Sequence, residues 1–372
     1  MIFYAKHLPF SFKPVTIYFK PIAETSQEGN EIKMKTQTNP TIYTLAEKAG
    51  VSAATVSRAL NNDKLINIKT RRQIQKMAEK EGYKKSPLAR NLSLGRTGVI
   101  AALLPSINNP IYTYLAAKIL ERAQERNYSV FLNYSEDSME REKKILNSFS
   151  NIQADGFIIF PSFSDRHEKC LKKLNRPVVI RGSVSGKCPF NAVWIDFHKG
   201  AYEATEYLIK QGQKNIRYMG FAGAVSCGDE RPSGFIKAMS GNGMKSPYKN
   251  IIDTGFNIES AYRTALKFLS QTKPDALLIQ SDYLAFGVLR AIGELKLRVP
   301  EDISIISFDN IEFSNYGTIP LTTMSQPFDE QAKLLVNTLL SRINNETLPV
   351  VHKKLDMKMI LRSSVCKKIR NK

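Results

Sequence analysis

The fold of the first part of the chain is decided by the stretch Thr41–Asn62, which reads TIYTLAEKAGVSAATVSRALNN. Its first apolar side chains recur at the spacing of one helical face, at Ile42, Leu45, Ala46 and Ala49. Gly50 suits the left-handed residue that ends a helix, and Ser52 suits the N-cap of the next one. The stretch therefore predicts two short helices, the second over residues 53–60 with Val56, Ala59 and Leu60 facing inward.

A third helix is predicted directly after these two. Asn67 can cap a helix over Ile68–Glu81, which would end at Gly82. Its inner face would carry Ile74, Met77 and Ala78. Two helices joined by a Gly-containing turn fit a helix-turn-helix, although an ordinary three-helix bundle shares this pattern.

The outer face of the second helix favours DNA binding over a plain bundle. It offers small or short polar residues beside one arginine, namely Ser52, Ala53, Ala54, Thr55, Ser57 and Arg58. Small side chains let a helix approach base edges in the major groove, and Arg can bind guanine with two hydrogen bonds. Residues 41–95 also hold eleven Lys and Arg against four Asp and Glu, a net charge of +7.

The composition of the whole chain narrows the function classes. The 372 residues carry a net charge of +20, which indicates a polyanionic partner, either nucleic acid or an acidic membrane surface. No stretch approaches 18 apolar residues, and no signal-peptide pattern is present, so we expect neither a membrane span nor export. The four Cys and four His lack metal-ligand spacing, and no nucleotide-binding or hydrolase motif occurs. We therefore expect free thiols in the cytoplasm, no metal, no cofactor and no enzymatic activity.

After Thr97 short apolar runs alternate with amphipathic segments. The runs are Val99–Leu104, Val130–Asn133, Gly156–Phe160, Val178–Ile180, Ile216–Phe221, Ala276–Gln280 and Ile303–Phe308. The segments between them include Tyr112–Arg126, Ala201–Gln211, Ile258–Leu269 and Leu284–Leu295. Such alternation predicts parallel sheets built from βαβ units. The number of units predicts two doubly wound α/β subdomains.

Together these segments resemble the LacI/GalR family of transcriptional repressors. Besides residues 41–62, the resemblance rests on KTRRQI (69–74), EGY (81–83), LARNL (88–92), ADGFIIF (154–160), PDALLIQSD (274–282), VPEDISIISFDN (299–310) and IPLTTMSQP (319–327). It covers roughly residues 41–364. It implies an all-α helix-turn-helix head over 41–85, a hinge helix and linker over 86–96, and an effector domain over 97–364 with the fold of periplasmic sugar-binding proteins. The subdomains would be 97–194 with 325–350, and 195–324 with 351–364.

The resemblance also implies residues that bind DNA. In the head these are Thr41, Tyr43, Ser52, Ala53, Ala54, Thr55, Ser57, Arg58, Asn61, Asn67, Thr70 and Tyr83. Asn67 and Thr70 could equally serve only as cap and packing residues. In the hinge, Leu92 would wedge into the minor groove, and Ala89 would let two hinge helices approach. One departure is that Lys84-Lys85-Ser86-Pro87 follows Tyr83, where the family usually has Pro and Asn.

For the effector domain, the resemblance implies a ligand cleft between the subdomains. Arg231, Asp282 and Phe256 match residues that bind or stack on a sugar, and Ile111 and Tyr112 lie on a loop that would face the cleft. Asp309 and Asn310 lie at the carboxyl end of a strand, where α/β clefts bind ligands. The expected effector is a sugar or sugar phosphate. The expected partners are operator DNA and a second copy of the chain, since no leucine heptad for tetramers follows Arg362.

Two alternatives remain open at this point. Within the repressor class, a phosphoprotein corepressor could control the protein, as in catabolite-control relatives. A sugar-binding protein of transport type would explain residues 97–364 but not 41–95. Residues 1–40 are expected to be a poorly ordered tail, with Met34 as a hypothetical translation start. Residues 365–372 are expected to be a solvated basic tail, because residues 352–372 carry a net charge of +7.

Overall fold

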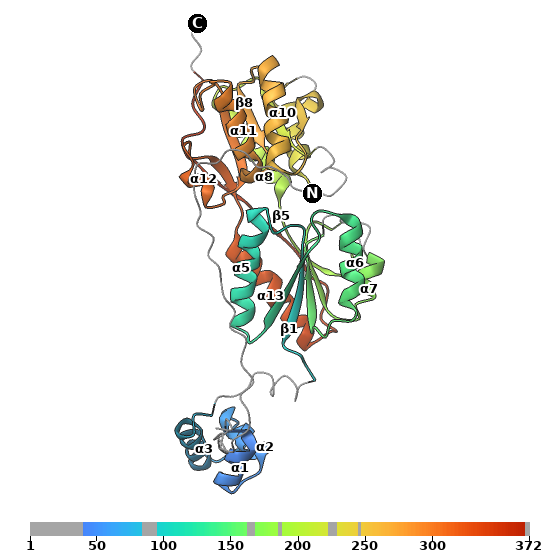
Figure 1. The fold of residues 1–372 in the computed structure, drawn as a ribbon, viewed down its shortest axis with the longest axis vertical. Coiled ribbons are helices and arrows are strands. Elements are labelled where there is room, and N and C mark those ends of the chain that lie inside the picture. Colours follow the sequence, from blue (N-terminus) through green and yellow to red (C-terminus); the bar gives the residue numbers. More distant parts are fainter. Residues whose placement is uncertain are drawn as a thin grey trace, which may run out of the picture. The chain divides into compact units, whose positions relative to one another are not determined.

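Three short helices, α1 (Ile42–Ala49), α2 (Ala53–Leu60) and α3 (Ile68–Lys80), form one of the two units of the computed structural model (Figure 1). The structure describes residues 40–83, 95–161, 168–184, 188–221, 229–244 and 247–368. Leu45, Val56, Ala59 and Ile74 form the centre of this unit and are at most 2% exposed. The helix-turn-helix prediction is confirmed, with α3 one residue shorter than expected.

The ends of these helices follow the predicted capping residues. Thr41 and Thr44 form a capping box at the start of α1, and Gly50 ends it at φ +64°, where a side chain would strain the backbone. The Ser52 hydroxyl accepts from the backbone N–H of Thr55, 3.1 Å away. The Asn67 side chain accepts from the N–H of Lys69 at the start of α3. The turn between α1 and α2 is therefore determined by local residues.

The second unit begins with a six-stranded parallel sheet. Its strands are β1 (Val99–Leu104), β2 (Ser129–Tyr134), β3 (Gly156–Ile159), β4 (Val178–Arg181), β5 (Asn191–Ile195) and β11 (His352–Leu355), in the order β11-β5-β4-β3-β1-β2. Its helices are α5 (Pro110–Gln124), α6 (Met139–Phe149), α7 (Glu168–Lys172) and α13 (Phe328–Asn344). In β1, Ile100 and Ala102 pack with α5 and α13, while Ala101 and Leu103 pack with α6 (Figure 1). Burial on both faces explains why this strand is wholly apolar.

The second sheet has the same layered plan. Its strands are β6 (Ile216–Gly220), β7 (Ile251–Asp253), β8 (Ala276–Ile279), β9 (Ser304–Asp309), β10 (Thr322–Ser325) and β12 (Lys358–Ile360), in the order β12-β10-β9-β8-β6-β7. Only β12 runs antiparallel, against β10. Helices α8 (Phe197–Lys210) and α9 (Arg231–Gly241) cover one face, and α10 (Ile258–Gln271) and α11 (Asp282–Glu294) cover the other. The short helices are α12 (Phe313–Tyr316) and the 3₁₀ helix η2 (Pro247–Asn250).

The chain passes between the two subdomains after β5, after β10 and after β11. The last crossing corrects the predicted boundary, which assigned all of residues 351–364 to the second subdomain. Strand β11 pairs in parallel with β5, so that His352 lies opposite Ala192 and Leu355 opposite Ile195 in the first sheet. Strand β11 lies at the edge of the sheet and buries only Leu355. Its other residues are exposed, so its sequence is basic and has no apolar run.

The described start of the C-terminal tail also differs from its prediction. Val365 packs on the core of the second subdomain, and the Lys368 N–H donates to the Gln211 carbonyl at 2.8 Å. The Lys368 ammonium pairs with Asp275, so these residues are attached rather than freely solvated. The predictions for residues 1–39, for most of the hinge (84–94) and for 369–372 lie outside the described residues. Within the described ranges, no helix is long and apolar enough to cross a membrane.

Candidate functional site

The first candidate site is the outer face of α2. Ala54 and Arg58 are exposed there, and Ser57 and Thr55 are half-buried between this face and the core. Arg58 makes no ion pair with any other described residue, whereas Lys48 is paired with Glu81 at 2.6 Å. The face therefore offers short side chains beside one guanidinium that has no ion pair within the described residues, a combination that suits the major groove.

Side chains of helix α3 hold the C-terminal end of α2 in place. The Gln75 amide donates to the Asn62 side chain at 2.8 Å and to the Ala59 carbonyl at 3.3 Å. The Arg71 guanidinium donates to the Asn62 carbonyl at 3.2 Å. Asn62 has φ +57°, a conformation that Asn tolerates better than most residues. These contacts hold the end of α2 at a set angle to α3, although the sequence analysis did not single out Gln75 or Arg71.

The other predicted DNA contacts fall into three groups. Thr41, Tyr43, Asn61 and Asn67 are exposed, as is the N-cap Ser52. Ala53, Thr70 and Tyr83 are half-buried, and Ala53 and Tyr83 pack on the core of the head. Ala89 and Leu92 lie outside the described residues. The structure assigns capping roles to Thr41, Ser52 and Asn67, and all twelve described DNA contacts stay predictions.

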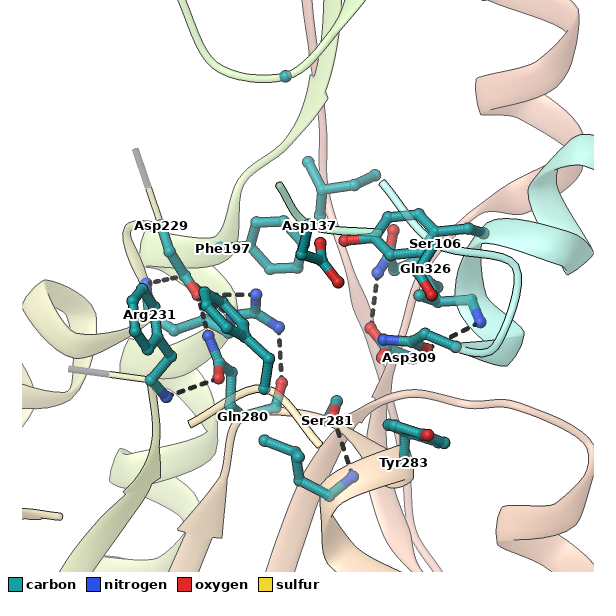
Figure 2. A pocket seen from close by; sticks show the side chains of 18 of the residues that line it. Ser106, Asp137, Phe197, Asp229, Arg231, Gln280, Ser281, Tyr283, Asp309 and Gln326 are labelled. Atoms are coloured by element: carbon teal, nitrogen blue, oxygen red, sulfur yellow. Dashed lines mark hydrogen bonds and ion pairs between the residues drawn. The ribbon is translucent and has the colours of Figure 1, made fainter. Parts of the chain in front are cut away.

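The second candidate site is a cavity of about 700 Å³ within the second unit, between the two subdomains (Figure 2). Residues at or just beyond the carboxyl ends of β1, β4, β5, β8 and β9 line it, which is the position where parallel sheets bind ligands. Arg231, Asp229 and Gln280 lie together on one side in Figure 2, and Asp309 and Gln326 on the other. The cavity is thus built from both sheets.

Arg231 is held in one position by charge and by aromatic rings. Its Nε donates to both carboxylate oxygens of Asp229 at 2.9 and 3.0 Å, and its Nη1 donates to the Gln280 carbonyl at 2.6 Å. The guanidinium lies 4.2 Å from the centroid of the Phe197 ring. Burial alone would lower the pKa of Arg231 and raise that of Asp229, but their attraction reverses both shifts. The pair is therefore fully ionised and internally neutral.

A second arginine, Arg181, lies at the end of β4. Its Nη2 donates to the Gln326 amide oxygen at 3.0 Å, and the Gln326 amide nitrogen donates to Asp309 at 2.7 Å. Burial lowers the pKa of Arg181 and raises that of Asp309. Asp309 has φ +106°, a rarely populated conformation that is typical of functional sites. Gln326 lies just after β10, where the chain crosses between the subdomains.

Aromatic side chains form much of the remaining lining. They are Tyr112, Trp194, Phe197, Phe221, Phe256 and Tyr283. Phe221 and Phe256 contact each other with centroids 3.7 Å apart. Burial raises the pKa of Tyr112 to about 12, so its hydroxyl is a neutral hydrogen-bonding group. Burial and Glu142 raise the pKa of Asp137, which also lines the cavity.

Five of the seven predicted effector residues line this cavity, namely Ile111, Tyr112, Arg231, Phe256 and Asp309. Asp282 does not line it: its Oδ1 accepts from Thr323 and Ser307, and its Oδ2 from the Ile311 N–H. Burial, and next the charge of Asp309, raise the pKa of Asp282 to about 7. Asn310 bonds to Arg362 and Ser325 and is also absent from the lining. In this structure Asp282 therefore joins the start of α11 to β9 and β10 by hydrogen bonds.

Several lining residues were missed by the sequence analysis. They are Asp229, Gln280, Ser281, Arg181, Gln326, Trp194 and Phe197. Arg181, Gln280 and Phe197 each lie at or within two residues of the carboxyl end of a strand, so the rule that selected Asp309 would have selected them too. Asp229 carries no such signal of its own, although it lies only two residues before Arg231, with which it pairs. Among the described residues, no cluster of His, Cys, Asp and Glu could hold a metal ion.

A helix-turn-helix head joined to a two-subdomain domain with an internal cavity defines a ligand-responsive DNA-binding regulator. Residues 41–86 match the family described as bacterial regulatory proteins, lacI family, and residues 205–365 match a periplasmic binding protein-like domain. Catabolite control protein A of Priestia megaterium is 30% identical over 313 residues, which are 83% of this chain and 94% of that protein. The transcriptional repressor PurR of Escherichia coli O139:H28 is 30% identical over 312 residues, 82% and 91% of the two chains.

A solved structure is also similar. A LacI family transcriptional regulator from Enterococcus faecium, with bound ribose, has 26% identity and a TM-score of 0.66, and the match covers 73% of this chain and all of that one. The chain belongs to the LacI family of bacterial transcriptional regulators. It is a DNA-binding repressor under effector control, and the named relatives are regulators of transcription rather than enzymes or transport proteins.

Proposed function

We propose that the effector is a carbohydrate bound in the cavity between the two subdomains. The lining combines flat aromatic rings, which suit the apolar C–H faces of a sugar ring, with fixed polar groups, which suit its hydroxyls. The observation that carries the proposal is the Arg231–Asp229–Gln280 cluster beside Phe197, a preorganised set of donors and acceptors next to an apolar surface. The ribose in the similar Enterococcus faecium regulator supports the same ligand class.

Ligand binding would act on DNA through the arrangement of the subdomains. A ligand that contacts both halves of the cavity stabilises one arrangement over another, and a coupling of about 1–3 kcal/mol would change operator occupancy roughly 5–150-fold. We propose that the protein acts in the cytoplasm as a homodimer. Its two heads would bind a pseudo-palindromic operator, with Arg58 and the small residues of α2 in the major groove. The hinge residues Ala89 and Leu92 would contact the minor groove between them.

A mobility-shift assay with upstream DNA of the gene's own neighbourhood tests this proposal. We expect a specific complex whose affinity changes when a panel of mono- and disaccharides is added, and calorimetry should give one site per subunit. Arg231→Met should abolish the response to sugar while leaving binding to DNA unchanged. DNA binding that no sugar alters, but that a phosphoprotein strengthens, would instead support the corepressor alternative.

A further inference from the structure

The two arginines of the cavity differ in how their charges are compensated. Arg231 forms an ion pair with Asp229, in which Nη2 lies 2.7 Å from a carboxylate oxygen, and the two side chains are 14% and 11% exposed. Arg181 forms no ion pair with any carboxylate of the described residues. One guanidinium of the cavity is thus neutralised within the protein, and the other is not.

Arg181 also has hydrogen-bond donors that no described residue accepts from. Its Nη2 uses one hydrogen in the bond to Gln326, and no hydrogen bond within the described residues uses its Nη1. Its Nε also has no partner among those residues, but protein atoms cover it, so the Nη groups are the donors that a ligand can reach. A buried donor without a partner is costly, and a guanidinium presents its donors as a planar fork that matches a carboxylate. Because Arg181 lines the cavity, a ligand there can supply the acceptor that these Nη donors lack.

Gln326 keeps the Asp309 carboxylate from supplying that acceptor. Its amide oxygen accepts from Arg181 while its amide nitrogen donates to Asp309, so the amide lies between the two charges. Exchanging the amide oxygen and nitrogen would break both bonds, because each partner would then meet a group of its own kind. Burial lowers the pKa of Arg181, which shows that the nearby charges only partly offset the loss of water around the guanidinium.

We propose that Arg181 makes the cavity selective for a sugar that carries a carboxylate, such as a hexuronate. This inference rests on the proposed function, a carbohydrate site. The guanidinium would donate to the carboxylate oxygens through Nη1 and the second hydrogen of Nη2, while the aromatic lining contacts the sugar ring. A phosphate dianion fits less well, because Glu136, Asp137, Glu230 and Asp309 also line the cavity and only one of its two arginines is free to compensate added charge.

Titration of the full chain with five probes tests the inference. The probes are D-glucuronate and D-galacturonate, their neutral parents D-glucose and D-galactose, and glucose 6-phosphate. Trp194 is the only tryptophan of the chain and lines the cavity, so its fluorescence reports binding, with calorimetry as a second readout. We expect at least one uronate to bind ten or more times tighter than its parent hexose.

Variants separate the charge of Arg181 from its structural role. Arg181→Gln should weaken uronate binding about 10–100-fold and change hexose binding less than threefold, and Arg181→Lys, which keeps the charge but not the fork, should lie between. Arg176→Gln is the matched control, since Arg176 is exposed five residues earlier in the same subdomain. The unfolding midpoint from Trp194 fluorescence verifies that each variant folds.

The outcomes distinguish this inference from the carbohydrate site itself. Hexoses that bind as tightly as uronates, an equal loss for both ligands in Arg181→Gln, or a preference for glucose 6-phosphate would each overturn the role of Arg181 and leave the carbohydrate site standing. Failure of all five probes to bind would overturn the proposed function and this inference with it.

Discussion

Removing the charge of Asp229 should destabilise the effector domain, because it leaves Arg231 unpaired in the cavity. Three contacts between 2.7 and 3.0 Å join the two side chains, which are 11% and 14% exposed. Breaking a buried pair from one side costs about 3–5 kcal/mol. The Gln280 carbonyl still accepts from Arg231 in the variant, so we expect Asp229→Asn to lower the free energy of unfolding by about 2–4 kcal/mol.

The measurement is denaturant unfolding followed by the fluorescence of Trp194, which reports on the effector domain because it lies in β5. Replacing the partner as well completes a double-mutant cycle. Arg231→Met alone leaves Asp229 without its cation, whereas the double variant leaves no unpaired charge. The double variant should therefore be more stable than the sum of the single changes by about 2 kcal/mol.

The cycle also defines the result that refutes this reasoning. A coupling energy below about 0.5 kcal/mol would mean that water compensates each charge as well as the partner does. Arg231 would then not be preorganised by Asp229, and the polar cluster would no longer support a carbohydrate site.

Three further predictions concern the head, a helix contact and a buried acid. Arg58→Ala should weaken specific operator binding by about 1–3 kcal/mol in a mobility-shift titration, because its guanidinium is free to bind guanine. Gly234→Ala should cost about 3 kcal/mol in denaturant unfolding, since the new Cβ would lie 2.1 Å from the His198 carbonyl oxygen in α8. Asp282 has a pKa of about 7 in the fold, so the folded protein holds a proton that the unfolded chain has lost above about pH 4. Its contribution therefore falls as pH rises, and between pH 5 and 8 the wild type should lose at most about 3 kcal/mol relative to Asp282→Asn.

Each of these has its own control. Lys80→Ala removes a charge at the end of α3 and should leave the preference for the operator sequence unchanged. Equal losses of operator affinity in the two variants would show that Arg58 does not contact a base. Gly241→Ala lies at the end of the same helix as Gly234, where no described atom is within 4 Å of the new Cβ, and it should be neutral or slightly stabilising. Parallel stability curves for the wild type and Asp282→Asn from pH 5 to 8 would show that the Asp282 pKa is not raised.

Local patterns were enough to determine the head of this protein. The spacing of Ile42, Leu45 and Ala46, the caps at Ser52 and Asn67 and the stop at Gly50 predicted all three helices within one residue. Helices and their caps depend on contacts within a few residues, so a short stretch of sequence contains the whole signal. The alternation after Thr97 predicted two sheets with parallel cores for a similar reason, because strands buried on both faces are continuously apolar.

Edge strands and the cavity depended on the tertiary structure. The basic strand β11 has no apolar run, and its pairing with β5 across more than 150 residues assigns it to the first sheet. Asp282 matched a ligand-binding pattern, but its carboxylate turns to Ser307 and Thr323, which only the packing of β9 and β10 brings near it. Arg231 is neutralised locally by Asp229, two residues earlier in the chain. Arg181 contacts Gln326, and Gln326 contacts Asp309, only because packing brings together segments far apart in the chain. The sequence therefore determined the helices of the head and the buried strands of the sheets, and only the three-dimensional packing decided which charges in the cavity remain free for a ligand.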